Sequence, residues 1–166
     1  MSDQDAGRPR PRPWLWMAIV GVIVVAIDQA TKAAVVSSLV LGESRDLALG
    51  FDLTRVTNSG IAFGLLDEGG DALVLVITGV ALLVVIGWFA VDAGRPWLWL
   101  GVGLLVGGAI GNLIDRIRLG SVTDFLNPPL WPAFNFADVA ITIGVAVVVL
   151  SALAPEPEPA GHPSEP

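Results

Sequence analysis

Residues 121–144 read SVTDFLNPPLWPAFNFADVAITIG, and they decide how the rest of the chain is interpreted. Two aspartates, Asp124 and Asp138, lie there directly beside long apolar segments. The prolines between them make this stretch a connector and not a membrane span. A carboxylate at the edge of a membrane segment costs free energy and usually has a function. The two aspartates therefore need a functional explanation.

Composition places the chain in a lipid bilayer. Of its 166 residues, 54% are apolar and 15% are charged, and the mean hydropathy is +0.72. An ordinary soluble domain is about 25% charged. A helix that crosses a bilayer needs about 20 mostly apolar residues. Four segments meet this requirement: residues 14–36, 72–91, 97–114 and 136–153.

The N-terminal arginines followed by an apolar run could indicate a cleaved signal peptide. An uncleaved first span is favoured, because the run is long and polar DQATK stands where small cleavage-site residues are expected. We expect a cytoplasmic N-terminal tail over residues 1–13 and a four-helix membrane domain over 14–154. Residues 155–166 form an acidic, proline-rich tail that we expect to be disordered.

Three N-terminal arginines place the N-terminus in the cytoplasm by the positive-inside rule. Four spans then place the C-terminus there as well, and the first and third connections outside. Lys32 and the arginines at positions 45, 55, 116 and 118 fall outside and oppose the rule. The N-terminal cluster has more weight because the first span usually sets the orientation. The polar residues of interest share the outer side: Asp28, Lys32, Asn58, Asn112, Asp115, Arg116, Asp124, Asn135 and Asp138.

The first outer connection contains DLALGFDLTRV, residues 46–56. Leu47, Leu49, Phe51 and Leu53 alternate with other residues there, which is typical of a half-buried strand. An irregular loop among the lipid headgroups is the alternative. We expect an all-α membrane protein of four transmembrane helices, with a small extracytoplasmic β-sheet between helices one and two whose apolar face meets the membrane.

Several kinds of chemistry are excluded by residue counts. The chain has no cysteine, and its one histidine, His162, lies in the tail. Neither a thiolate nucleophile nor a Ser-His-Asp triad nor an H-E-x-x-H zinc site can be built in the folded part. The net charge of −7 argues against nucleic acid as a partner.

Asp124 and Asp138 offer a different chemistry if the last two spans are neighbours, as their short link indicates. Two converging carboxylates in a poorly hydrated site share one proton. The ionised member can take a proton from water, and the neutral member can donate a hydrogen bond to a peptide carbonyl. The alternative is that both aspartates cap helices or face solvent.

Other polar residues flank this pair. Asp28 and Lys32 have i, i+4 spacing and can pair, either as a brace for the site or as an interfacial salt bridge with a snorkelling lysine. Asn112 and Asp115 share a helix face, and Arg116 could hold a carboxylate or a lipid phosphate. A simple cap and salt bridge is the alternative. Nearby glycines permit close helix contact.

Four blocks, DQATK, NSGIAFGLL, GGAIGNLIDRIRLGSVTDF and WPAFNFADVAITIG, resemble the bacterial lipoprotein signal peptidases (signal peptidase II) in order and spacing. The resemblance runs from Asp28 to Gly144. It implies an aspartic endopeptidase in the bacterial cytoplasmic (inner) membrane. Such an enzyme removes the signal peptide from diacylglyceryl-modified prolipoproteins, cutting before the lipidated cysteine at the outer face. It also implies four transmembrane helices with a small extracytoplasmic sheet, and no metal or cofactor.

By motif, the resemblance places the catalytic pair on Asp124 and Asp138. The supporting or substrate-binding positions, with Asp115 added from its place in the cluster, are Asp28, Lys32, Asn58, Gly60, Asn112, Asp115, Arg116 and Asn135. Diacylglyceryl-prolipoproteins and membrane lipids are the expected partners, and we expect a monomer. Ile61 and Thr123 depart from the family's usual alanine and valine, and neither touches a proposed catalytic atom.

Other functions stay open at this point. Lys32 and Ser59 could form a Ser-Lys dyad, although Asp28 would favour the charged lysine. A presenilin-like protease is mechanistically close, but its G-x-G-D motif is absent from the sequence. Asp28, Asp115 and Asp138 could relay protons in a small transporter. A structural membrane subunit would leave the one-sided polar residues unexplained.

Overall fold

The computed structural model describes residues 12–48, 50–59 and 70–155. Gly60 and Ile61 lie outside the described residues, as do almost all of the two expected tails. The expectations for these positions stay predictions.

Four helices form the body of the protein: α1 (Pro13–Ser38), α2 (Gly70–Asp92), α3 (Leu98–Leu119) and α4 (Phe136–Leu153). Each is long and apolar enough to cross a membrane, which confirms the four expected spans. The main difference is in α3, which continues to Leu119 and does not end near residue 114. Asp115 and Arg116 are therefore helical residues near the end of α3.

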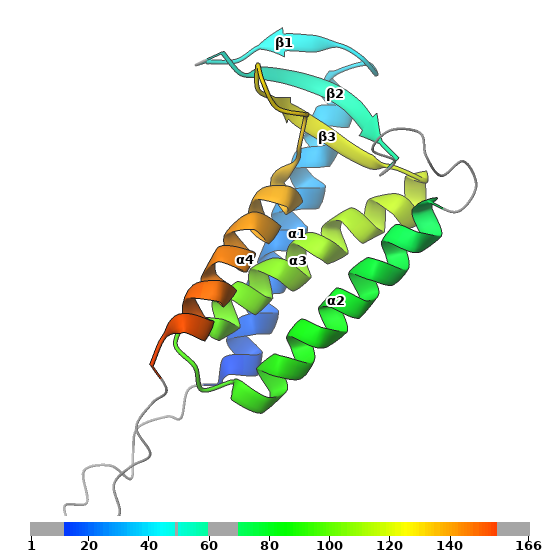
Figure 1. Cartoon of the computed structure of the whole chain (residues 1–166). Helices are drawn as coiled ribbons and strands as arrows, with labels where there is room; N and C mark the ends of the chain where they lie inside the picture. The colour runs from blue at the N-terminus through cyan, green and yellow to red at the C-terminus, as the bar shows by residue number, and fades with distance from the viewer. Residues whose placement is uncertain (1–11, 49, 60–69, 156–166) are drawn as a thin grey trace, which may run out of the picture.

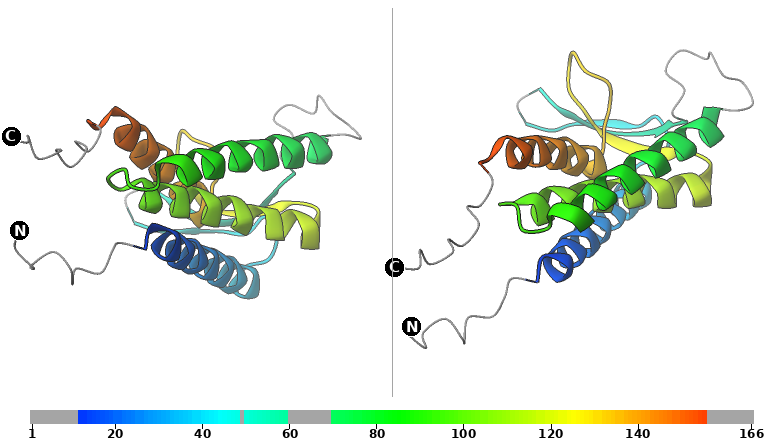
Figure 2. Two further views of the ribbon diagram at one scale, coloured as in Figure 1. Left: turned by 90° about the horizontal axis from the view of Figure 1, so that it is seen from below. Right: turned by 60° about the horizontal axis from the view of Figure 1, so that its bottom comes forward.

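Helix α3 is the centre of the bundle: 56% of the residues in its most apolar segment are buried, compared with 6% in that of α2. Figures 1 and 2 show α1 and α4 beside it, with α2 along another side. Glycines allow these close contacts. A Cβ on Gly107 would lie 2.8 Å from the Gly21 carbonyl oxygen of α1, and one on Gly108 would lie 2.6 Å from the Ala137 oxygen of α4. Small residues thus bring the helix backbones together.

An antiparallel sheet of three strands covers one end of the helices (Figure 1). Its order is β1 (Ser44–Asp46), β2 (Asp52–Asn58) and β3 (Val122–Asn127). The beginning of α1 and the end of α4 lie at the opposite end of the bundle (Figure 1). The expected sheet is present, but its third strand comes from the connection after α3.

The single strand expected from the alternation in residues 46–56 is wrong, because a hairpin turn interrupts it. The Leu47 N–H donates to the Phe51 carbonyl at 2.8 Å, and Gly50 has a φ of +79°. Leu47 is 49% exposed, while Leu53 packs on a buried cluster beneath the sheet. The apolar alternation continues through the turn, so periodicity alone could not reveal it.

The sheet is attached to α1 by apolar and polar contacts. Val35 and Leu39 of α1 are buried against Phe125 of β3. Arg45 donates to the Ser38 carbonyl at 2.9 Å, and Arg55 donates to the Leu39 carbonyl at 3.0 Å. Both arginines therefore satisfy carbonyls that the end of a helix leaves free. This structural role accounts for two of the arginines that oppose the positive-inside rule.

We predict that Gly108→Ala destabilises the bundle by about 1–3 kcal/mol, since its Cβ would press on the backbone of α4. Gly87→Ala in α2 is the matched control, because nothing lies within 4 Å of its added Cβ. This control should leave stability unchanged or raise it by up to about 1 kcal/mol. Thermal unfolding in detergent measures both, and equal melting temperatures for the two variants would contradict the packing argument.

Candidate active site

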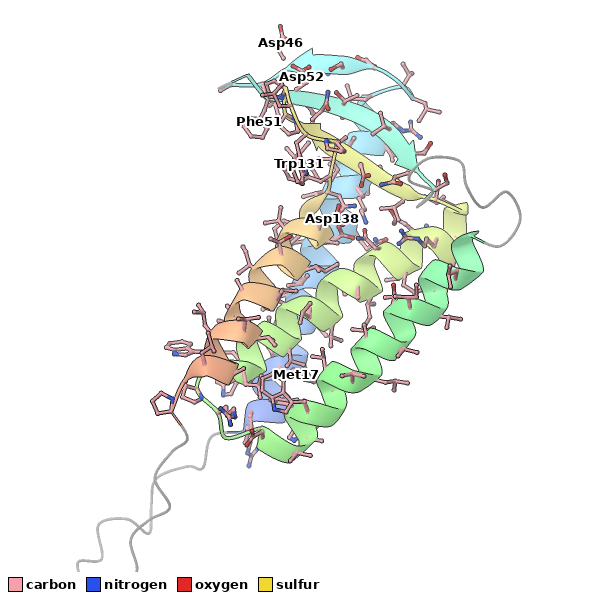
Figure 3. The ribbon with its side chains drawn as sticks, viewed as in Figure 1. Met17, Asp46, Phe51, Asp52, Trp131 and Asp138 are labelled. Atoms are coloured by element: carbon pink, nitrogen blue, oxygen red, sulfur yellow. The ribbon has the colours of Figure 1, made fainter. Side chains whose placement is uncertain are left out.

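The two aspartates come from different elements and meet at the sheet end of the bundle. Asp124 lies in β3 and is 2% exposed, and Asp138 lies in the first turn of α4. Figure 3 shows Asp138 at the end of α4 that faces the sheet, near Trp131. Backbone hydrogen bonds between Leu126 and Phe134 fold the connector back, which brings Asn135 beside Asp124.

Asn135 joins the two carboxylates directly. Its Nδ2 donates to Asp124 Oδ1 at 2.7 Å, and its Oδ1 accepts from the Asp138 backbone N–H at 3.1 Å. The Asn135 N–H donates to Asp138 Oδ2 at 3.0 Å, which completes a capping box at the start of α4. The convergence expected from sequence is therefore realised through a helix cap.

Amide groups surround the pair. Asn58 Nδ2 donates to Asp124 Oδ2 at 3.0 Å, and Asn112 Nδ2 donates to Asp138 Oδ1 at 2.9 Å. With the two bonds from Asn135, each of the four carboxylate oxygens accepts one hydrogen bond from an amide. These donors fix the orientation of both carboxylates.

The environments of the two carboxylates differ. Burial is the largest effect and raises the pKa of Asp124, and the nearby negative charge of Asp138 raises it further. Hydrogen bonds from Asn58 and Asn135 and the positive charge of Lys32 lower the pKa. The net shift is upward, so Asp124 keeps its proton to higher pH than an ordinary aspartate. Asp138 is half-buried and borders a cavity of about 360 Å³. The other residues lining it are Trp131, Phe134, Val139, Thr142 and Ile143.

Lys32 is buried, with 4% of its surface exposed, so the interpretation as a snorkelling interfacial lysine is wrong. Its Nζ lies 2.9 Å from Asp28 Oδ2 and 3.2 Å from Asp115 Oδ2. It also donates to Asn112 Oδ1 at 3.0 Å, and Asn112 contacts Asp138. Asp28, Lys32, Asn112 and Asp115 thus form one network with the aspartate pair.

This network argues against two of the alternatives. Lys32 is buried and bound by two carboxylates, whereas Ser59 is exposed just after β2, which argues against a Ser-Lys dyad. The carboxylates proposed for a proton relay lie at one end of the bundle. The α4 segment from residue 139 to residue 153 has no ionisable side chain to continue a path.

Arg116 lies near this network without joining it fully. Its guanidinium makes a long contact of 3.5 Å with the Asn112 carbonyl, and its Nε is buried without a hydrogen-bond partner among the described residues. No carboxylate of the described chain pairs with it. It borders a cavity of about 200 Å³ between α2, α3 and α4. Arg116 is thus placed to bind an acceptor on a ligand.

Sequence reasoning missed one polar side chain in the cluster. Gln29 donates through Nε2 to Asp28 Oδ2 at 3.1 Å and to Asp115 Oδ1 at 3.1 Å. Its only signal was its place next to Asp28 in DQATK. Among the described residues, no group of His, Cys, Asp or Glu is arranged to hold a metal ion.

Comparison with known proteins identifies related chains. A family model for signal peptidase (SPase) II matches residues 20–154. A lipoprotein signal peptidase of Pelotomaculum thermopropionicum is 42% identical over 136 residues, covering 81% of this chain and 90% of the relative. One of Moorella thermoacetica is 40% identical over 146 residues, covering 87% and 97%. A bacterial membrane enzyme structure solved by the in meso method at 1.9 Å has a TM-score of 0.76 and 31% identity, covering 82% of this chain and 92% of that one.

We predict that Lys32→Met lowers the free energy of unfolding by about 3–5 kcal/mol, because it leaves two buried carboxylates without their cation. Arg118→Met is the matched control, since Arg118 is exposed in the last turn of α3. The control should cost less than about 1 kcal/mol. Chemical unfolding in detergent compares the two. A Lys32→Met protein as stable as the control would show that the buried cluster does not depend on its charge.

Proposed function

The chain belongs to the signal peptidase II family, and we propose that it is an aspartic endopeptidase that removes the signal peptide from diacylglyceryl-modified prolipoproteins. Cleavage occurs before the lipidated cysteine, at the outer face of the bacterial cytoplasmic membrane, with both termini in the cytoplasm. The convergence of Asp124 and Asp138 on Asn135 is the observation that carries the proposal. The sheet end, opposite the first residue of α1 and the last of α4, is then the outer end.

The two environments assign different roles to the aspartates. Asp138 lies at a helix N-terminus and accepts two amide hydrogen bonds, which stabilise negative charge, and it borders the open cavity. Asp124 is buried and its pKa is raised, so the scheme below assigns the proton to Asp124.

Peptide hydrolysis then follows in two steps. Asp138 takes a proton from water as the water oxygen forms a bond to the scissile carbonyl carbon, while Asp124 gives its proton to the carbonyl oxygen. The tetrahedral intermediate collapses when Asp138 returns a proton to the leaving nitrogen and the C–N bond breaks. Asp124 recovers its proton from the hydroxyl as the new carboxyl group forms. Water is the nucleophile, so the scheme needs neither a nucleophilic side chain nor a metal.

A lipid-bearing substrate fits this location. The cavity beside Asp138 is lined mostly by apolar residues of α4 and the connector, and Ile143 is 50% exposed on the surface that meets lipid. Acyl chains can stay in the bilayer while the scissile bond reaches the carboxylates at the end of the helices. Arg116 and Asn112, which border the cavity on the α2 side, can bind substrate carbonyl or ester oxygens.

We predict that Asp124→Asn and Asp138→Asn each lower turnover by at least about a thousandfold, because each removes one proton-transfer group. The assay follows a purified diacylglyceryl-prolipoprotein in detergent, with a chelator present, and reads the mass lost with the signal peptide. Asp46→Asn is the matched control, because Asp46 is exposed at the outer edge of the sheet and should leave turnover unchanged (Figure 3). A non-lipidated precursor should stay intact. Full-rate cleavage by either Asn variant would refute the two-aspartate mechanism.

A pH profile tests the role of Asp124. The mechanism needs its neutral form, so activity is present below its raised pKa and is lost as pH rises through that pKa. The groups that act on Asp124 are Asn58, Asn135, Asp138 and Lys32. Asn58→Leu removes a hydrogen bond that lowers the pKa, so we predict that the alkaline limb of kcat shifts to higher pH.

Asn127→Leu in the same sheet is the control for this profile, because Asn127 is not among the groups that shift the pKa of Asp124. Its alkaline limb should coincide with that of the wild type. A limb that moves to lower pH in Asn58→Leu, or that does not move at all, would assign the neutral role to a group other than Asp124.

A further inference from the structure

Two buried carboxylates hold the backbone immediately before each member of the aspartate pair. Asp115 Oδ2 accepts from the Thr123 N–H at 3.0 Å, one residue before Asp124. Asp28 Oδ1 accepts from the Ala137 N–H at 3.1 Å, one residue before Asp138. Each proposed catalytic residue is therefore attached through its own backbone to a separate, buried anchor.

Lys32 and Gln29 of α1 connect these two anchors. Lys32 Nζ contacts both carboxylates at 2.9 and 3.2 Å. Gln29 Nε2 contacts both at 3.1 Å and also the Gly111 carbonyl at 3.2 Å. Since all three neighbours are acceptors, the amide nitrogen of Gln29 must face them. We call Asp28, Asp115, Lys32 and Gln29 together the carboxylate bridge.

We propose that the carboxylate bridge sets the separation of Asp124 and Asp138, and that Gln29 is a positioning residue for the reaction. This inference rests on the proposed function. Along the chain, β3 and the first turn of α4 are joined by a connector whose tip is exposed, with Leu130 at 97% and Trp131 at 70%. The carboxylate bridge adds a connection through α1 and α3 that holds β3 and the first turn of α4 at a fixed distance.

The charge of the bridge explains why a neutral amide is needed. Asp28 and Asp115 carry two negative charges and Lys32 carries one positive charge, so one negative charge remains in a buried place. Two N–H groups of Gln29 stabilise this excess without adding a second cation. Gly111 lets α1 approach, because a Cβ there would lie 2.6 Å from Asp28 Oδ2. The geometry thus depends on an amide at position 29 and on a glycine at position 111.

Gln29→Leu tests the inference with the full-length enzyme and the diacylglyceryl-prolipoprotein substrate. Gln29 borders a cavity of about 290 Å³, so the leucine has room and causes no clash. We expect kcat to fall by about ten- to a hundredfold, because the two reacting carboxylates are displaced from each other. KM should change by no more than about twofold, because the cavity beside Asp138 that receives the substrate is unaltered. The assay runs well below the melting temperature and counts only protein that elutes as folded.

Thr31→Val is the matched control, because within the described part of the chain Thr31 Oγ1 bonds only to carbonyls of its own helix, Ile27 and Asp28. It should keep the wild-type kcat and KM. A Gln29→Leu enzyme that melts earlier yet keeps the wild-type kcat would overturn the positioning role. If this variant does not fold, Gln29→Asn decides. Its amide is too short to reach both carboxylates, so the same fall in kcat is expected, and an unchanged kcat overturns the inference. Absence of cleavage by the wild type would instead refute the proposed function.

Discussion

The buried ammonium group of Lys32 is the interaction on which the rest of the structure depends. A charge in a membrane protein interior is tolerated only with close partners, since its desolvation costs several kcal/mol. Asp28 and Asp115 supply two carboxylates, and Asn112 supplies an amide oxygen. Through these partners α1 is fixed to α3, and through their remaining oxygens and amides to β3 and α4. One cation thus organises every element that carries the site.

Such a cluster forms only if the helices approach closely, and the glycines of α3 provide this. Gly107 and Gly111 face α1, while Gly108 faces α4. A larger residue at these positions would separate the backbones and leave charges without partners. The small residues and the buried charges are therefore two parts of one solution: close backbones shorten the polar contacts, and the polar contacts hold together helices that gain little hydrophobic energy from association in lipid.

Hydropathy and residue spacing predicted the features that depend on local sequence. The four spans, the Asp28–Lys32 pair and the meeting of Asp124 with Asp138 could all be inferred, because each follows from length, i, i+4 spacing or a short connection. β3 could not, because VTDFLN is short and acquires its partner only when β2 folds against it. The burial of Lys32 and the contacts of Gln29 depend on α3, 80 or more residues away in the chain. The arginines at 45 and 55, which count against the expected orientation, bond to carbonyls at the end of α1, and no count of charges can indicate such contacts.

The two aspartates differ in environment because they lie in different secondary-structure elements. Asp124 is in a strand buried between β2 and the end of α1, so its environment is dry and favours the neutral acid. Asp138 is in the first turn of a helix, where free N–H groups and the helix dipole favour an anion, and it reaches the cavity. In the proposed mechanism, a strand and a helix N-terminus thereby give two identical side chains opposite tasks. Asn135 contacts both aspartates, so the N-terminal cap of α4 and the proposed reaction centre form a single structure. The aspartates therefore cannot move apart without disrupting the start of α4.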